Sequence, residues 1–143
     1  MRVFLAGIMQ GSRLDSGIHS QNYRDAIREA ILDRHPDAEV ICPFELHPNS
    51  VDYDEATGRR TLLGLAHMAG QCDAVVAYVP EASMGTAIEM WQAHEAGKQI
   101  WTISPLSANW VIRFLSTRVF PDVGEFVRYV RANGLDDPQT NKR

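Results

Sequence analysis

The feature of this sequence that most restricts its fold is the segment 74–79, which reads Ala-Val-Val-Ala-Tyr-Val. The run is almost entirely apolar and rich in β-branched residues. That pattern is typical of a central parallel strand that is covered on both of its faces. The segment therefore predicts an α/β domain with helices on either side of a sheet.

Further apolar runs alternate with helical patterns along the chain. We expect strands at 2–6, 39–42, 74–79, 99–103 and 118–120, and helices at 21–34, 59–71, 84–96, 110–115 and 123–133. The alternation predicts a Rossmann-like, flavodoxin-like parallel sheet of about five strands with helices on both faces. The segment 43–58 is polar, contains two prolines and lacks periodicity, so we expect a loop there.

Length and charge limit the domain count and the partners. With 143 residues, 45% of them apolar, the chain is long enough for one core. We expect one domain at 1–134 and a flexible polar tail at 135–143. The net charge of −4 gives no basic surface, so long nucleic acid is not an expected partner, whereas a small anionic ligand is allowed.

The start of the chain and the cysteines bear on location. The apolar run at 2–6 is too short for a signal sequence, and no stretch is long enough to span a membrane. Cys42 and Cys72 are most simply read as buried reduced thiols, although a disulfide between them is not excluded by their positions. The two cysteines lack the CxxC spacing that would suggest a metal site. These features favour a cytoplasmic protein.

In parallel sheets of this kind, ligands bind beyond the carboxyl ends of the strands. That rule selects the loops at 7–18, 80–85 and 104–109. The helix after the second of these loops contains Glu89 among apolar neighbours. A carboxylate desolvated in this way is a candidate nucleophile or acid/base. The alternative, on spacing alone, is a glutamate on the solvated face near a helix N-terminus.

The loop after the first strand contains Gly7, Gly11, Ser12 and Arg13. Two glycines, a hydroxyl and a guanidinium suit a phosphate or a carboxylate. The loop matches neither the P-loop nor the GxGxxG pattern. An ordinary turn with an exposed Arg13 is the competing interpretation.

Several segments resemble the nucleoside 2-deoxyribosyltransferases and the related 2'-deoxynucleoside 5'-monophosphate N-glycosidases. They are Val3-Phe4-Leu5-Ala6-Gly7, Gln10-Gly11-Ser12-Arg13, Cys72-Asp73-Ala74-Val75-Val76-Ala77, Ser83-Met84-Gly85-Thr86-Ala87-Ile88-Glu89-Met90, Ala96-Gly97-Lys98-Gln99-Ile100 and Leu106-Ser107-Ala108. The likeness extends from residue 3 to about residue 110.

The resemblance implies an enzyme in which Glu89 attacks the anomeric carbon and no metal or cofactor takes part. It implies that Ser83 contacts a 5'-phosphate, where the nucleoside transferases have a base-contacting aspartate. Gly7, Gly11, Ser12, Arg13 and Gly85 would complete the ligand site. Ser107 or Asn109 would reach the site of a neighbouring subunit.

A homo-oligomer, at least a dimer, is also expected from the residue types present. Several large apolar side chains exceed what one small core readily accommodates, and some of them would cover a subunit contact. They are Met84, Met90, Trp91, Trp101, Trp110 and Phe114.

Two positions differ from the family pattern. Phe4 stands where a first-strand tyrosine usually bonds the catalytic glutamate, and Leu65 lies near the expected position of a sugar-contacting aspartate. The favoured interpretation is cleavage or transfer of the N-glycosidic bond of a nucleoside 5'-monophosphate. The alternative is a non-catalytic nucleotide-binding or sensing domain, or a different nucleotide-processing enzyme built on the same sheet.

Overall fold

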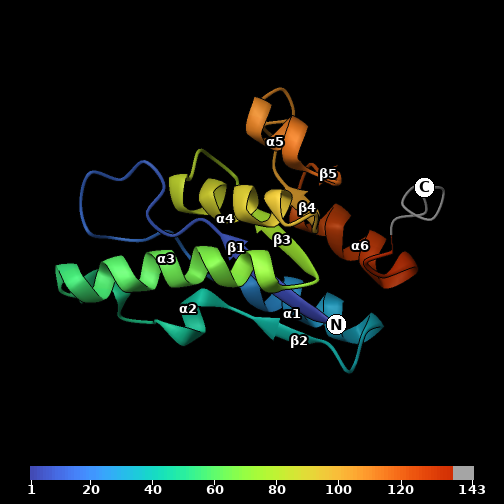
Figure 1. Cartoon of the computed structure of the whole chain (residues 1–143). Helices are drawn as coiled ribbons and strands as arrows, with labels where there is room; N and C mark the ends of the chain where they lie inside the picture. Colours follow the sequence, from blue (N-terminus) through green and yellow to red (C-terminus); the bar gives the residue numbers. More distant parts are fainter. Residues whose placement is uncertain (137–143) are drawn as a thin grey trace.

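The computed structural model describes residues 1–136 and contains one five-stranded, fully parallel sheet in the order β2-β1-β3-β4-β5 (Figure 1). This is the expected flavodoxin-like arrangement. In chain order the elements are β1 (Arg2–Gly7), α1 (Tyr23–Arg34), β2 (Glu39–Ile41), α2 (Pro43–Leu46), the 3-10 helix η1 (Ser50–Asp52), α3 (Glu55–Gln71), β3 (Ala74–Tyr78), α4 (Met84–Glu95), β4 (Gln99–Ile103), α5 (Trp110–Leu115), β5 (Arg118–Phe120) and α6 (Val123–Asn133).

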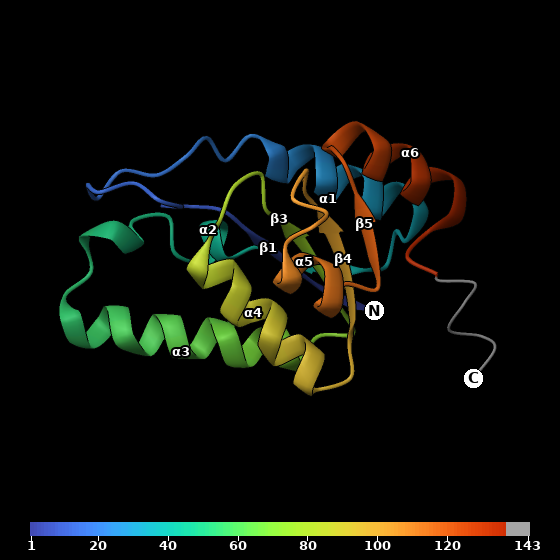
Figure 2. The same ribbon diagram turned by 90° about the horizontal axis from the view of Figure 1, so that it is seen from above.

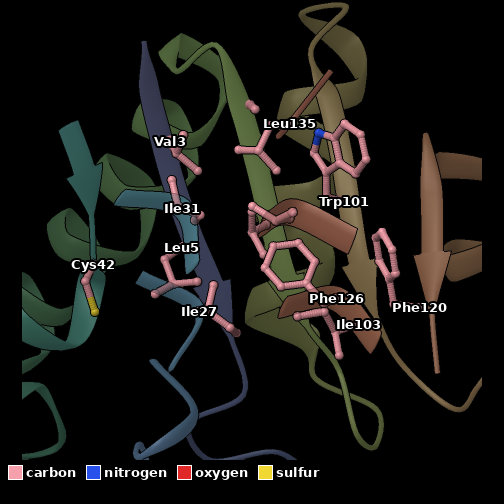
Figure 3. Packing of buried hydrophobic residues seen from close by; sticks show 13 residues of the cluster. Val3, Leu5, Ile27, Ile31, Cys42, Trp101, Ile103, Phe120, Phe126 and Leu135 are labelled. Atoms are coloured by element: carbon pink, nitrogen blue, oxygen red, sulfur yellow. The ribbon is translucent and has the colours of Figure 1, made fainter. Parts of the chain in front are cut away.

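Helices cover both faces of the sheet. Figure 2 shows α1 and α6 on one side and α3 and α4 on the other. On the α1 and α6 side, Ile27, Trp101 and Phe126 are fully buried, and Figure 3 shows these side chains gathered against β1, β3 and β4. Each such side chain contributes roughly 1.5–3 kcal/mol through its removal from water.

The other face is packed by α3, α4 and α5. Phe4, Met90 and Ile112 are buried there. Both cysteines are free and buried, and they belong to different layers: Cys42 packs in the α1 and α6 cluster and Cys72 in the α3 and α4 cluster. The sheet therefore separates the two thiols, and the reduced-thiol interpretation is the one that the structure bears out.

Three expectations from the sequence need correction. The segment 43–58 is not one loop, because α2 and η1 lie within it. Helix α3 begins at Glu55 rather than at 59, since Asp54 caps it by accepting a hydrogen bond from the backbone N–H of Thr57 at 2.7 Å. Helices as short as α2 and η1 carry no periodic signal, which is why the sequence pattern does not indicate them.

The third correction concerns the end of the domain. Leu135 falls in the expected flexible tail, but it is buried in the core, and its backbone N–H donates to the His35 imidazole at 3.0 Å. Asp136 is exposed, and residues 137–143 of the expected tail lie outside the described residues. No helix within residues 1–136 is long and apolar enough to cross a membrane.

The strand order places a topological switch point at one end of the sheet. The chain leaves β1 towards β2 on one side, whereas β3 lies on the other side of β1, with Gly7 paired to Tyr78 at the carboxyl end. This reversal is the point where α/β folds bind ligands. The loop at 8–22 and the N-terminal ends of α3 and α4 lie at this end in both views (Figures 1 and 2).

Candidate active site

Glu89 lies in the second turn of α4, close to the carboxyl end of β3. The helix turns Thr86, Met90 and Ala93 towards the sheet, so Glu89 occupies the border of the buried face and is itself half-buried. Within residues 1–136 its carboxylate makes no hydrogen bond or ion pair. It therefore lies in a partly desolvated position with both oxygens unengaged.

The surroundings of Glu89 oppose its ionisation. Burial raises the pKa of the carboxyl group to about 8, and the positive charge of Arg24 acts in the opposite direction. A carboxylic acid with a pKa in this range exchanges its proton near neutral pH. That property is common among groups that perform chemistry.

Tyr23, the first residue of α1, packs against the carboxyl end of β1. Its hydroxyl donates to the Ile8 carbonyl at 3.0 Å, and its ring lies 4.1 Å from the Tyr78 ring, centroid to centroid. Gly7 is required for this arrangement, because a Cβ there would lie 2.2 Å from the Tyr23 hydroxyl oxygen. Burial is the main reason why the Tyr23 pKa is raised, and the charge of Glu89 contributes to the increase. The ring therefore lies within the electrostatic reach of Glu89.

The glycine loop after β1 closes against the loop after β3. Gly11 has φ +58, and a Cβ there would lie 2.6 Å from a carboxylate oxygen of Glu81. The Ser12 hydroxyl donates to the same oxygen at 3.4 Å. The His19 Nε2 lies 3.0 Å from it. A carboxylate of the chain itself thus occupies the place that the sequence predicts for an anion.

Arg13 does not join this group. Its Nε and one terminal nitrogen donate to the two carboxylate oxygens of Asp15, both at 3.0 Å. The hydrogen bond from Arg13 is the main reason why the pKa of Asp15 is lowered. The structure therefore brings Gly11 and Ser12 together with Glu81, and leaves Arg13 paired at the exposed tip of the loop.

Ser83 and Asn109 line a different hollow. Ser83 precedes the first turn of α4, and its hydroxyl is 2.9 Å from that of Thr86. Asn109 caps α5 by accepting from the backbone N–H groups of Val111 and Ile112. Both line a cavity of about 150 Å³ between α4 and α5, and Glu89 is not among its lining residues.

Gly85 and Ser107, the remaining predicted ligand residues, belong to the segments on either side of this cavity. The space above Gly85 is open, since an added Cβ would meet nothing within 4 Å, and Ser107 is exposed. A second hollow of about 200 Å³ lies beside the glycine loop and is lined by Met9, Gln10 and Leu65 among others. Among residues 1–136 there is no group of three or more His, Cys, Asp or Glu side chains placed to bind a metal ion.

Comparison with known proteins finds no matching family model and no matching curated protein. Solved structures do match. A 2-deoxyribosyltransferase from Bacillus psychrosaccharolyticus superposes with a TM-score of 0.64 at 18% identity, covering 98% of this chain and 95% of that chain. The chain has the fold of that enzyme.

Two further structures agree. The CMP N-glycosidase BcmB from Clostridium botulinum gives a TM-score of 0.52 at 20% identity, over 92% of this chain and 99% of that chain. A conserved protein from Enterococcus faecalis V583 gives 0.55 at 15% identity, over 92% of this chain and 98% of that chain. The likeness therefore covers nearly the whole of each structure.

Four residues of this region are not indicated by the sequence patterns: His19, Tyr23, Arg24 and Glu81. Glu81 lies in one of the loops selected by the strand-end rule, so its position could have been found. Tyr23 and Arg24 begin a helix that reads as an ordinary amphipathic one, and no local pattern indicates that they fold back onto the end of β1.

Proposed function

We propose that this protein cleaves or transfers the N-glycosidic bond of a nucleoside 5'-monophosphate, with Glu89 as the nucleophile. The observation that carries the proposal is a partly desolvated carboxylate, without a partner among residues 1–136, beside the switch point of the sheet. The solved structures of similar fold include a 2-deoxyribosyltransferase and a CMP N-glycosidase, and this supports the reaction class.

The chemistry follows the two-step logic of retaining glycosidases. The ionised Glu89 carboxylate forms a bond to C1' as the C1'–N bond breaks, and the electron pair of that bond leaves with the base. The product is a glycosyl ester on Glu89. Water, or the nitrogen of a second base, then attacks C1' and releases the carboxylate, while the attacking group gives up its proton to the solvent.

The phosphate is proposed to bind between the N-terminus of α4 and the glycine loop. Ser83, Gly85 and the backbone N–H groups of the first helical turn offer donors on one side, and Gly11 and Ser12 offer them on the other. The contact of Gly11 and Ser12 with Glu81 supports an affinity of this loop for oxyanions. On phosphate binding, Glu81 would be exchanged for the ligand.

Arg13 is proposed to supply charge to the phosphate after releasing Asp15. Its side chain is 44% exposed and belongs to the same loop as Gly11, so the exchange needs only rotation of exposed side chains. The competing interpretation, an exposed arginine in an ordinary turn, has the pairing with Asp15 in its favour. Substitution of Arg13 distinguishes the two.

A homo-oligomer is proposed, at least a dimer. The outer faces of α4 and α5 expose large apolar side chains: Met84, Ile88, Trp91, Trp110 and Phe114. Trp101 and Met90, by contrast, are buried in the core. Ser107 is exposed next to α5, which supports a role for Ser107 or Asn109 at the site of a neighbour. The two free thiols support a cytoplasmic location.

A sensing domain without turnover is the second candidate. Phe4 is fully buried on the α4 side of the sheet and offers Glu89 no hydroxyl, and Leu65 lines the hollow beside the glycine loop with an apolar side chain. Both observations favour a domain that binds a nucleotide without cleaving it.

The test is incubation of the purified protein with a panel of nucleosides and their 5'-monophosphates, followed by chromatography of the free base. We expect base release from monophosphates and its loss in Glu89→Gln. Glu95→Gln, at the exposed end of the same helix, is the matched control and should keep full activity. Binding without base release from any compound would support the sensing domain instead.

A further inference from the structure

Arg24 is a buried cation without a carboxylate partner among the described residues. Only 4% of its surface is exposed. The other arginines with close partners behave differently: Arg13 pairs with Asp15 and Arg131 with Asp33 at the surface. A buried charge is costly unless an opposite charge compensates it, so an unpaired one requires an explanation.

The hydrogen bonds of Arg24 fix its position but do not neutralise it. The guanidinium donates to the carbonyls of Leu5 at 2.9 Å and Gly7 at 3.3 Å, and to the side-chain oxygen of Gln21 at 2.7 Å. A further contact of 3.6 Å joins it to the Cys42 sulfur. All four acceptors are neutral, so the positive charge is held rigidly behind the carboxyl end of β1.

Arg24 and Glu89 lie at the same end of the sheet. Arg24 is held on the carbonyl of Gly7, Gly7 pairs with Tyr78 at the carboxyl end of β3, and Glu89 follows in the second turn of α4. Helix α4 packs against α3, α5, β1, β3 and β4. Besides Glu89, these elements and α4 itself carry the following charged or titratable side chains: Arg2, Glu55, Arg59, Arg60, His67, Tyr78, His94, Glu95 and Arg113. Within the described part of the chain, Arg24 is the charged group whose positive charge lowers the pKa of Glu89 against the effect of burial. Tyr23, next to Arg24, is the other titratable group coupled to Glu89.

We infer that Arg24 is a positioning residue: it is the fixed counter-charge that keeps the Glu89 carboxylate available as a nucleophile without forming an ion pair with it. The inference deepens the proposed function and rests on it. A direct ion pair would engage the oxygen that must attack C1'. A guanidinium anchored on the carbonyls of Leu5 and Gly7 favours the anion electrostatically and leaves both oxygens of Glu89 unbonded.

The titration of Glu89 tests this directly and needs no substrate. Protein labelled with ¹³C at the glutamate carboxyl groups is titrated by NMR, and the Glu89 signal is identified by its loss in Glu89→Gln. The wild-type midpoint is expected at about 8. In Arg24→Gln it should rise by about one pH unit or more, because an opposite charge has been removed. An unchanged midpoint in folded Arg24→Gln overturns the inference.

Arg24→Lys separates charge from hydrogen bonding and serves if Arg24→Gln does not fold. Lysine keeps the positive charge but cannot reproduce the planar set of hydrogen bonds. The Glu89 midpoint should then stay within about half a pH unit of the wild-type value, because the charge is retained. If the Glu89 midpoint rises in Arg24→Lys as much as is expected for loss of the charge, the positive charge of Arg24 does not control the pKa of Glu89.

The pH profile of base release supplies the catalytic readout. The acid limb of kcat/KM should move upward in Arg24→Gln in step with the NMR midpoint, and Arg24→Lys should restore it. A purely structural role would lower the plateau and leave the limb in place, which would contradict the inference. If wild-type protein releases no base from any compound, the proposed function fails, and the NMR titration still decides whether Arg24 controls Glu89.

Discussion

The Glu81 carboxylate lies 3.0 Å from the His19 imidazole, and this contact joins the loop after β3 to the loop after β1. The same oxygen accepts from Ser12 and lies against Gly11. If the proposed phosphate site is correct, an oxyanion of the chain competes for its donors. Under the proposed function, we expect a single substitution at Glu81 to change the affinity for anions.

Glu81→Gln should strengthen the binding of a nucleoside 5'-monophosphate by about tenfold, because one competing charge-assisted contact of roughly 1.5–3 kcal/mol is weakened. Calorimetry with CMP measures the change, and cytidine, which lacks the phosphate, should bind as it does to the wild type. Glu95→Gln is the control for loss of one negative charge at the surface. Weaker or equal binding of CMP would argue against a phosphate at this loop.

Arg13→Ala should weaken monophosphate binding by about one to two orders of magnitude, because a charge-assisted hydrogen bond contributes about 1.5–3 kcal/mol. Affinity for the free nucleoside should hardly change. Asp15→Asn is the informative companion, because it frees Arg13 from its present partner and should strengthen phosphate binding. If both variants bind CMP like the wild type, Arg13 is an ordinary exposed residue.

Glu89→Gln should change the pH dependence of stability in a defined direction. The folded-state pKa of Glu89 is raised from 4.5 to about 8, so the folded protein binds more protons than the unfolded chain between these values. Its contribution is fully present below pH 4.5 and is lost as the pH rises through about 8. Relative to wild type, the glutamine variant should therefore gain stability progressively up to about pH 9.

Urea unfolding of both proteins across the range from about pH 4 to pH 9 measures this difference, since contributions of other groups cancel. The free energy of unfolding of Glu95→Gln should vary with pH in parallel with that of the wild type. Parallel curves for Glu89→Gln and wild type would mean that Glu89 is not desolvated in solution.

Gly7→Ala should destabilise the fold by about 1–3 kcal/mol, because the new methyl group collides with the Tyr23 ring and hydroxyl. Tyr23→Phe removes the closest atom and should recover part of the loss in the double variant. Gly64→Ala in α3 is the matched control: nothing lies within 4 Å of its added methyl, and it should be neutral or stabilising. Equal effects of the two alanine substitutions would refute the close approach of Tyr23.

Light scattering at micromolar concentration tests the proposed oligomer, for which a stable monomer of 16.0 kDa is the contradicting outcome. Trp110→Arg should dissociate the assembly, since Trp110 is 76% exposed on α5. Leu14→Arg, in the exposed loop after β1, controls for added charge and should leave the mass unchanged. Mixed oligomers of Glu89→Ala and Ser107→Ala chains should recover activity if the serine acts across the interface.

The fold could be predicted from the sequence because strand and helix signals here are local. The apolar run at 74–79 and the spacing of apolar residues in α1 and α4 reflect burial directly. Glu89 could be singled out because the strand-end rule and the family resemblance both indicate its segment. Arg24 and Tyr23 could not, because their contacts with Leu5, Gly7 and Ile8 depend on how a helix returns to a strand, which no short pattern encodes.

The long sequence separation between paired strands has a consequence for the folding kinetics. All strand pairs are parallel, and β1 pairs with β3, whose residues lie some 70 positions later, as Val3 with Ala74. The strands within residues 1–136 contain no hairpin that could start the sheet, so β1 lacks its partner β3 until β3 has been synthesised and the connection between them has folded. The switch point at their carboxyl ends therefore forms in the same cooperative step as the core, so a chain that has folded its core has also formed this end of the sheet.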